Sequence, residues 1–423
     1  MTVRYTALLL TFAAAEFAQD PARLDQPARL DQIVQTYVAS DHYMGTVLVA
    51  KGDQVLFSKG YGSANLEWNI PNAPSTKFRL GSITKQFTAA SILLLEERGK
   101  LSVGDPVKKY YPDAPAAWDK ITVYNLLTHS SGIPHLTSFP DYLTTEALPS
   151  PAEKTLLRFR DKPLDFEPGS KFSYSNSGYV LLGYLVEKLS GQSYEKFLQE
   201  NIFTPLKMKD SGYDSNSEVI ARRASGYSPG GRGGALVNAG FVHMSIPGGA
   251  GGLYSTTEDL RWERGLFGGK LLSAASLAKM TTPYKDDYAF GVIAQTQQGR
   301  KRIWHNGGIQ GFNTSMAWYP ESKVVVIVLA NVNGGAPDAM LPKLAAVAHG
   351  EKVELSTEHK EITVSGDVLA RYVGVYATPS GGPIIVISRQ GDQLSEKLGN
   401  HQGVPDFSGV RNDVFSESGG CAD

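Results

Sequence analysis

Two pairs of β-like segments stand far apart in this chain, and their separation constrains the fold more than any other feature. Residues 46–50 and 54–59 alternate apolar and polar side chains around a Lys-Gly-Asp turn, which predicts a hairpin. Residues 315–319 and 323–329 are again rich in β-forming side chains and flank a Pro-Glu-Ser turn. Residues 82–283 are mostly helical in pattern. We therefore predict a mixed α/β fold, in which one antiparallel β-sheet is flanked by helices and a mainly helical lobe is inserted between its early and late strands.

The size and charge of the chain restrict its class. Its 423 residues can bury a large core, and 42% of them are hydrophobic. The net charge of −1 and the lack of a long basic run argue against a nucleic-acid partner. The single cysteine, Cys421, lies at the end of the chain, so an intrachain disulfide is impossible and a cysteine-based metal site in the core is not expected. We expect no metal and no cofactor.

The N-terminus has the pattern of an export signal over residues 1–18. Arg4 supplies a positive charge, residues 5–12 are apolar, and Ala13–Ala15 fit a small-residue cleavage site. The apolar run is too short to cross a bilayer as a helix, so we expect no transmembrane span. The alternative is a disordered cytoplasmic tail. We expect an exported protein, either periplasmic or secreted.

The remaining boundaries follow from composition. The hexapeptide PARLDQ occurs twice in a row, and we interpret residues 19–32, which contain it, as a linker. The other expected parts are a main domain at 33–349, a charged linker at 350–361 and a small or incomplete β-rich appendage at 362–423. Within them we expect helices at 30–40 and 338–347 and β runs at 371–376 and 383–388.

Ser82 and Lys85 stand three residues apart where a helix is expected to start, and they form the first catalytic candidate. A serine hydroxyl is a weak nucleophile until a base lies beside it. An i, i+3 spacing places both side chains on one helix face. The same S-x-x-K pattern occurs at Ser193–Lys196 and Ser276–Lys279, so spacing alone does not identify a site. A serine here can also be a plain helix N-cap.

The surroundings favour the first copy. A short extended run that ends in a glycine, residues 78–81, precedes Ser82, and an apolar helix expected over 86–101 follows it. That helix has the pattern of a buried central helix. Ser82 would lie in its first turn, where free N–H groups and the helix dipole favour developing negative charge. The other two copies lie in segments with the pattern of surface helices.

Tyr174 and Asn176 form the only Y-x-N in the chain, in a polar segment before an apolar helix expected over 179–189. A tyrosine accepts a proton only if nearby cations lower its pKa from about 10, and a Lys85 ammonium would do so. The Asn176 amide could steady Lys85 and bind a substrate carbonyl. The alternative is a turn with an asparagine N-cap.

The third candidate element is the H-N-G-G run at His305–Gly308, just before the late strands. Glycines let a strand backbone approach a ligand closely, and a backbone N–H there could be the second oxyanion donor. A second H-x-G occurs at 401–403 in the appendage, where no cleft is expected. A lone histidine in a loop is more often a surface or structural residue.

A competing signal is the G-x-S-x-G pattern at 226–230, around Ser228. This pattern marks the nucleophile elbow of α/β-hydrolases, which needs a strand before it and a helix after it. The proline after the serine and the glycine-rich run that follows argue against such an elbow. We therefore do not expect Ser228 to be a nucleophile.

Taken in this order, the three elements resemble the serine β-lactamase and penicillin-binding-protein superfamily, in its class C β-lactamase-like branch. That branch includes D,D-peptidases, D-aminopeptidases and family VIII carboxylesterases. The segments ITVYNLLTHSSGIP at 121–134, FSYSNSGYVLLG at 172–183 and GGLYSTTEDL at 251–260 also look like signatures of the family. The resemblance covers roughly residues 30–348 and implies a β-lactamase/transpeptidase-like fold, followed by a small C-terminal β segment.

By this resemblance Ser82 is the acylated nucleophile, Lys85 its activator, and Tyr174 the general base or acid. Asn176 would bind the acyl amide of the substrate. The backbone N–H groups of Ser82 and Gly308 would form the oxyanion hole. The implied reaction is two-step acyl transfer through an acyl-enzyme, with neither metal nor cofactor.

One departure from the family bears on the substrate. Many β-lactamases carry K-T-G where this chain has His305, Asn306 and Gly307, which we expect to bind substrate. Histidine is mostly neutral near pH 7, so the permanent positive charge for a substrate carboxylate is missing. The resemblance therefore implies an esterase or D,D-peptidase with weak β-lactamase activity. His129, which lies inside a family signature, would be structural.

The expected partner is a small-molecule ester, β-lactam or D-amino-acid peptide. The alternative is a penicillin-binding or sensor protein that is acylated but turns over slowly. A scaffold without chemistry would be expected to lack Ser82, Lys85 or Tyr174, and all three are present. A penicillin sensor is normally tethered to a membrane, and we expect no transmembrane span in this chain. Both points favour an enzyme.

Overall fold

The computed structural model describes most of the chain as two units, Met1–Leu355 and Ser356–Asp423, which are treated separately below. The described residues are 26–39, 43–230, 235–355, 358, 364–376, 384–391 and 393–399. The expected signal peptide at 1–18, the H-x-G at 401–403 and Cys421 lie outside them.

The centre of the first unit is a six-stranded antiparallel sheet in the order β10-β11-β12-β13-β1-β2. Its strands are β1 (Gly45–Lys51), β2 (Gln54–Tyr61), β10 (Ile293–Gln297), β11 (Arg300–Ile309), β12 (Phe312–Tyr319) and β13 (Val324–Ala330). The early strand β1 pairs directly with the late strand β13, with Gly45 opposite Ala330. The predicted mixed α/β fold with early and late strands in one sheet is confirmed.

Two strands of this sheet, β10 and β11, were not predicted. The first half of β11 carries Arg300, Lys301 and Arg302, and its second half carries the H-N-G-G run. Charged residues and glycines are depleted in strands, so local propensity indicates a loop here. Pairing with β12 on one side and β10 on the other overrides that preference.

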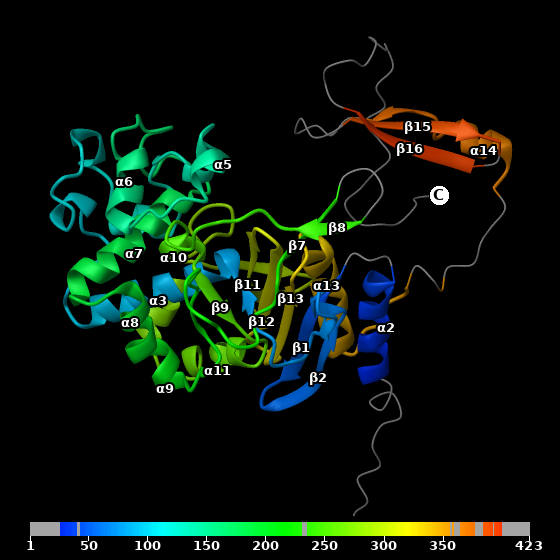
Figure 1. Cartoon of the computed structure of the whole chain (residues 1–423), viewed down its shortest axis with the longest axis horizontal. Coiled ribbons are helices and arrows are strands. Elements are labelled where there is room, and N and C mark those ends of the chain that lie inside the picture. The colour runs from blue at the N-terminus through cyan, green and yellow to red at the C-terminus, as the bar shows by residue number, and fades with distance from the viewer. Residues whose placement is uncertain are drawn as a thin grey trace, which may run out of the picture. The chain divides into compact units, whose positions relative to one another are not determined.

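The two faces of the sheet carry different layers, as alternation along the strands requires. Val47 and Val49 of β1 point into a core cluster with α2 (Gln26–Val38) and α13 (Ala336–Ala348), whereas Leu48 and Ala50 point into the cluster of the helical lobe. Figure 1 shows α2 and α13 on one side of the sheet and the helical lobe on the other. The lobe side is the one that carries the S-x-x-K segment.

Both segments expected to be linkers around this unit were assigned too widely. Residues 26–32 form the first turns of α2, because Leu30, Ile33 and Val34 make an apolar stripe that is fully buried. Beyond α13, Leu355 packs into the same cluster, and Glu351 pairs with Arg300. Both segments are mostly polar in composition, so the few apolar residues that pack into the core were not recognised from sequence.

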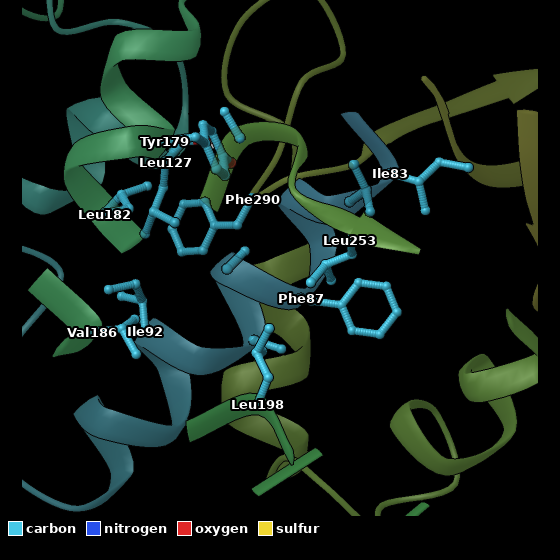
Figure 2. Close-up of a cluster of buried hydrophobic side chains, with 14 of the residues drawn as sticks. Ile83, Phe87, Ile92, Leu127, Tyr179, Leu182, Val186, Leu198, Leu253 and Phe290 are labelled. Atoms are coloured by element: carbon cyan, nitrogen blue, oxygen red, sulfur yellow. The ribbon is translucent and has the colours of Figure 1, made fainter. Parts of the chain in front are cut away.

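The helical lobe is built around α3 (Thr84–Glu97), in which every residue from Thr84 to Leu95 is buried. Figure 2 shows Phe87 and Ile92 of α3 surrounded by apolar side chains of α7, α8 and β9. The other lobe helices are α4 (Val123–Leu127), α5 (Tyr142–Thr145), α6 (Ala152–Arg160), α7 (Asn176–Ser190), α8 (Tyr194–Leu198), α9 (Thr204–Leu206), α10 (Gly248–Gly251), α11 (Glu263–Leu266) and α12 (Ala274–Thr281).

Short strands join this lobe to the sheet: β3 (Ser63–Asn65), β4 (Ile70–Pro71), β5 (Phe78–Arg79), β6 (Gly212–Tyr213), β7 (Tyr227–Pro229), β8 (Leu236–Asn238) and β9 (Leu253–Ser255). In the second unit, α14 (Gly366–Ala370) precedes an antiparallel sheet of β14 (Gly374–Tyr376), β15 (Ile384–Gln390) and β16 (Gln393–Gly399). None of the helices in the described ranges is both long and apolar enough to cross a membrane.

Candidate active site

Ser82 lies in a single 3₁₀ turn, Gly81–Ile83, between β5 and α3. Gly81 has a φ of +54°, in the left-handed region that glycine adopts without strain, so the chain can turn sharply from strand to helix. Ser82 is half-buried, and its hydroxyl contacts Lys85 and Tyr174. The position before α3 is occupied by Ile83, so Ser82 is not its N-cap.

Lys85 is fully buried and directed at the serine. Its Nζ lies 3.0 Å from Ser82 Oγ, 2.8 Å from Asn176 Oδ1 and 2.8 Å from Ala250 O. Burial holds its pKa well below the ordinary value, which favours the neutral amine. A neutral amine has two hydrogens and one lone pair. The amide and carbonyl oxygens can only accept, so they take both hydrogens, and the lone pair is left for the Ser82 hydroxyl.

Tyr174 lies on the other side of Ser82, with its hydroxyl donating to Ser82 Oγ at 2.7 Å. Burial raises its pKa above the ordinary value. This differs from the expectation that a Lys85 ammonium would lower it. The Lys85 Nζ is 4.8 Å from the centre of the Tyr174 ring, but a buried lysine that is itself neutral supplies no charge. In the free protein Tyr174 is therefore a proton donor, and Lys85 is the available base.

Asn176 is the first residue of α7, which places its amide at the helix start directly beside Lys85. The amide lines the same cavity as Ser82. The alternative expectation of an asparagine N-cap does not apply, because the N-cap position is Ser175. Geometry thus allows Asn176 both to hold Lys85 and to face a substrate.

Gly307 and Gly308 bring β11 against the turn that carries Ser82. A Cβ added to Gly307 would stand 2.0 Å from Leu80 O, and one added to Gly81 would stand 2.8 Å from Gly308 N. Only glycine permits this contact of two backbones. Gly308 lines the cavity together with Ser82, as the expected pair of oxyanion donors requires.

The structure does not bring His305 and Asn306 to the cavity. His305 is 2% exposed, its Nδ1–H donates to Asn306 O at 2.5 Å, and its Nε2 accepts from Tyr288 at 3.1 Å. Burial lowers the pKa of His305 to about 3, so it stays neutral. The Asn306 amide points the other way and donates to Asp338 of α13 at 2.8 Å. Alternation along β11 explains why neighbours in sequence face opposite layers.

The cavity beside Ser82 has a volume of about 430 Å³ and two unlike walls. One wall is apolar and is formed by Leu136, Tyr142, Val180, Val242 and Ile246. The other carries the amides of Gln310, Asn313 and Asn333. Among the residues that the structure describes, no charged side chain lines this cavity.

Comparison with known proteins agrees with this arrangement. The sequence pattern of the Beta-lactamase family matches residues 30–350. The chain belongs to this family. Its relatives include a Bacillus subtilis protein named as a penicillin-binding protein, PbpX, which is 30% identical over 72% of this chain and 75% of its own. The family resemblance and its class C-like character are confirmed, and the protein is a serine hydrolase of the Beta-lactamase family.

Solved structures of the family share the fold. An octameric penicillin-binding protein homologue from Pyrococcus abyssi is 29% identical, with a TM-score of 0.70 and 88% of each chain covered. A D-stereospecific amidohydrolase from Streptomyces sp. is 25% identical, with a TM-score of 0.66 over 77% of this chain and 99% of that one. The β-lactamase-like fold is confirmed.

Several cavity residues of this family member were not found from sequence. Gln310 and Asn313 lie on the β11–β12 hairpin just after the H-N-G-G run, so their closeness to that run was a usable signal. Asn333 follows β13, and the carbonyl of Ala250 comes from α10, with no local pattern to mark either. Only the tertiary fold brings these groups to Ser82.

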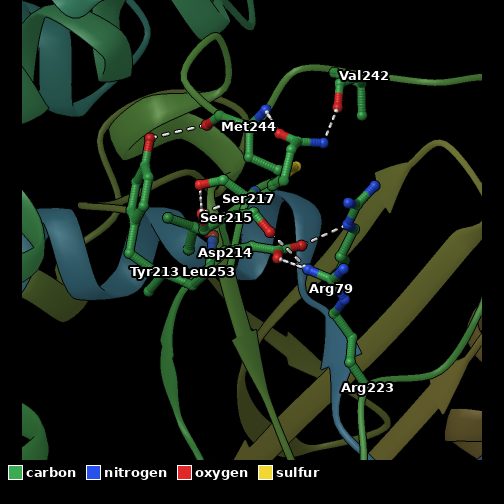
Figure 3. Close-up of polar contacts among 11 residues, drawn as sticks. Arg79, Tyr213, Asp214, Ser215, Ser217, Arg223, Val242, Met244 and Leu253 are labelled. Carbon is green, nitrogen blue, oxygen red and sulfur yellow. Dashed lines mark hydrogen bonds and ion pairs between the residues drawn. The ribbon is translucent and has the colours of Figure 1, made fainter. Parts of the chain in front are cut away.

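A buried ion pair holds β5, the strand that precedes the Ser82 turn. Arg79, in β5, donates to Asp214 at 2.5 Å, and Arg223 pairs with the other oxygen of the same carboxylate. Figure 3 shows both guanidinium groups in contact with the carboxylate of Asp214. The Asp214 side chain is fully buried, so each charge depends on its partners. This cluster fixes the strand that leads into the Ser82 turn.

The competing sequence signals lie elsewhere and have structural roles. Ser193 caps α8 by accepting the N–H of Lys196. In the third copy the Lys279 amine pairs with Glu96, and the Ser276 hydroxyl accepts from Ser273. Ser228 is in β7, paired with β8, and donates to Asn333. Neither a lysine amine nor a strand–turn–helix elbow accompanies these serines. In the described ranges, no cluster of His, Cys, Asp and Glu could hold a metal ion.

Proposed function

We propose that this protein hydrolyses neutral esters through an acyl-enzyme on Ser82. The observation that carries the proposal is the cavity itself. Ser82, in contact with Lys85 and beside Gly308, opens into a space that the described residues line with apolar and amide groups and with no charged side chain. A substrate with a free carboxylate would leave water there and find no cation to pair with. A neutral acyl group meets no such cost.

The proposed acylation step uses the contacts seen in the free protein. Ser82 Oγ attacks the ester carbonyl carbon while its proton passes to the Lys85 amine. The carbonyl oxygen becomes an oxyanion held by the N–H groups of Ser82 and Gly308. As the carbon–oxygen bond of the ester breaks, Tyr174 gives its proton to the leaving alkoxide. The Lys85 ammonium then returns a proton to Tyr174, which leaves both groups neutral.

Deacylation repeats these roles with water in place of the serine. Lys85, again neutral, accepts the proton of a water that attacks the acyl carbon and then passes it to Ser82 Oγ. The oxyanion forms at the same two N–H groups, and Ser82 leaves with a proton restored to its oxygen. No step requires His305, which is buried against Tyr288, or Asn306, which donates to Asp338; neither lines the cavity.

A second candidate substrate class is the amides and short peptides of amino acids, including D-amino-acid peptides. Gln310, in the amide wall, donates to the buried carboxylate of Glu146 at 2.6 Å. A carboxylate directly behind the wall favours a substrate ammonium group over a substrate carboxylate. One solved relative is named a D-stereospecific amidohydrolase, which supports amide chemistry as the second arm.

Intact mass spectrometry with three compounds tests the proposal. The protein is exposed in parallel to a short-chain p-nitrophenyl ester, a D-Ala-D-Ala peptide and a penicillin. We expect a transient acyl adduct and fast turnover with the ester, and slow or no acylation by the two carboxylates. A stable penicillin adduct with no ester turnover would instead identify the slowly released penicillin-binding or sensor protein.

Two serine variants identify the nucleophile. Ser82→Ala should reduce ester turnover by roughly 10⁴-fold or more, because loss of a covalent nucleophile disables the whole unit. Ser228→Ala is the matched control, because it removes a hydroxyl from the competing pattern without contact to Lys85. If Ser228→Ala were the inactive variant, the assignment of Ser82 would be wrong.

A further inference from the structure

The start of α7 is capped by imidazole rings and not by its own residues. The N–H of Ser175 donates to Nδ1 of His129 at 3.1 Å, and the N–H of Asn176 donates to Nδ1 of His135 at 2.9 Å. Ser175, at the N-cap position, makes no side-chain cap, because its hydroxyl donates to Ile133 O. The N–H groups at a helix start need acceptors, and the loop between α4 and α5 supplies both.

The capped residues are the ones that hold the site together. Tyr174 directly precedes them and donates to Ser82, and the Asn176 amide accepts from Lys85. The ring of His129 is 4.3 Å from that of Tyr174, and the ring of His135 is 6.0 Å from it. The two histidines therefore fix the backbone from which both groups reach the nucleophile and its base.

Both imidazoles can do this only when uncharged. A ring nitrogen that accepts an N–H carries no proton, whereas an imidazolium has a proton on each nitrogen. In His135 the proton is therefore on Nε2, which lies 2.6 Å from Thr137 Oγ1 and donates to it. Burial lowers the pKa of His129 and His135, in agreement with neutral rings.

A carboxylate would be the stronger cap for a helix start, because it also interacts with the positive end of the helix dipole. Next to Lys85, however, a negative charge would stabilise the ammonium form. The titratable groups that face Lys85 in the described part of the chain are uncharged ones: Tyr174, Tyr179, His129, His135 and His305. A neutral acceptor caps the helix and adds no charge to the surroundings of Lys85.

We propose that His135, together with His129, is a positioning residue that caps α7 as an uncharged acceptor, holding Tyr174 and Asn176 in place while leaving Lys85 free to act as a base. This inference rests on the proposed function, in which neutral Lys85 takes the proton of Ser82. It assigns a role in the reaction to a loop that touches neither the nucleophile nor the substrate's reacting atoms.

Three substitutions of His135 separate the effect of its hydrogen-bond acceptor from the effect of a charge at this position. His135→Asn keeps a neutral acceptor and should leave kcat/KM for the ester near the wild-type value. His135→Leu removes the acceptor and should lower kcat/KM by about 10- to 100-fold, the usual effect of misplacing catalytic groups. His135→Asp keeps the acceptor but adds charge, and should move the rise of kcat/KM with pH upward by about one unit or more.

The same three substitutions at His349 are the control. Its ring bonds to Ser322 and Ala345 at the α13 side of the sheet, so charge there should leave the pH profile unchanged. Identical pH profiles for His135→Asn and His135→Asp would overturn the charge argument. Wild-type kinetics in His135→Leu, or equal damage in His135→Asn and His135→Leu, would overturn the positioning role.

A measurement on the wild-type protein does not depend on how the variants fold. Nitrogen-15 NMR of histidine distinguishes the two neutral tautomers, and we expect the His135 proton on Nε2 at neutral pH. A proton on Nδ1 would refute the proposal. If Ser82→Ala kept full ester turnover, the proposed function would fail instead, and the tautomer measurement would still decide the capping role.

Discussion

Replacing Gly307 with alanine should separate β11 from the serine turn. The new Cβ would stand 2.0 Å from Leu80 O and 3.0 Å from Ser82 N. Carbon and oxygen atoms in close backbone contact stay about 3.3 Å apart, so one of the two segments must move by roughly 1 Å. Because Gly308 is the next residue, its N–H moves with the strand. Both oxyanion donors belong to the segments that are pushed apart.

The size of the effect follows from this displacement. A shift of about 1 Å in a positioned group typically costs about 100-fold in rate, and loss of one oxyanion donor costs about 10²- to 10³-fold. We therefore expect kcat/KM for a p-nitrophenyl ester to fall by about 100- to 1000-fold in Gly307→Ala. Overpacking should also reduce the free energy of unfolding by about 1–3 kcal/mol.

The assay compares kcat/KM, thermal unfolding and the extent of Ser82 labelling by a fluorophosphonate. Gly104→Ala is the control for a glycine-to-alanine change, because the nearest atom to its added Cβ is Ser102 Oγ at 3.8 Å. Labelling counts the folded, competent molecules, so a loss of stability can be separated from a loss of rate. A folded Gly307→Ala protein with wild-type kcat/KM would refute the reasoning.

Three further predictions concern buried charge. Asp214→Ala should lower the free energy of unfolding by about 3–5 kcal/mol in urea, because Arg79 and Arg223 lose their buried partner, whereas Asp119→Ala in an exposed pair should change little. At pH values between the lowered pKa of Lys85 and its ordinary value of about 10.4, the unfolded chain binds one proton more than the folded chain, so the free energy of unfolding should rise with pH. Urea unfolding measured at several pH values should show a weaker dependence of this free energy on pH in Lys85→Met. His305→Lys should lower the melting temperature without raising nitrocefin hydrolysis relative to the ester, because it buries an ammonium away from the cavity; an increase in that ratio would contradict the placement of His305.

The sequence predicted those parts of the site that are local in the chain. The spacing of Ser82 and Lys85 places both on one turn, and Tyr174 and Asn176 lie two residues apart before a strongly apolar helix. In each case the helix needed for the geometry is marked by its own hydrophobic pattern. These elements therefore appeared where they were expected.

The rest of the site depends on tertiary contacts that no local pattern encodes. His305 and Asn306 read as a substrate-binding pair, but β11 is a strand, and its alternation turns them to opposite layers. The expected lowering of the Tyr174 pKa by a Lys85 ammonium is also not found, because the desolvation of Lys85 arises only once α10 and α7 close over the amine. The place of Gln310 in the site follows only from its hydrogen bond to Glu146, which lies 164 residues earlier in the sequence.

The pairing of β1 with β13 also determines when the nucleophile becomes active. Gly45 pairs with Ala330, so the centre of the sheet joins the two ends of the first unit and cannot form in a growing chain that stops before β13. Contacts between such distant segments form late in folding, because the connecting loop must close first. The Ser82 turn leaves the ribosome long before Gly308 does. A partly synthesised chain thus carries the serine and the lysine but lacks the oxyanion strand, and the hydrolase is inert until its last sheet strands are in place.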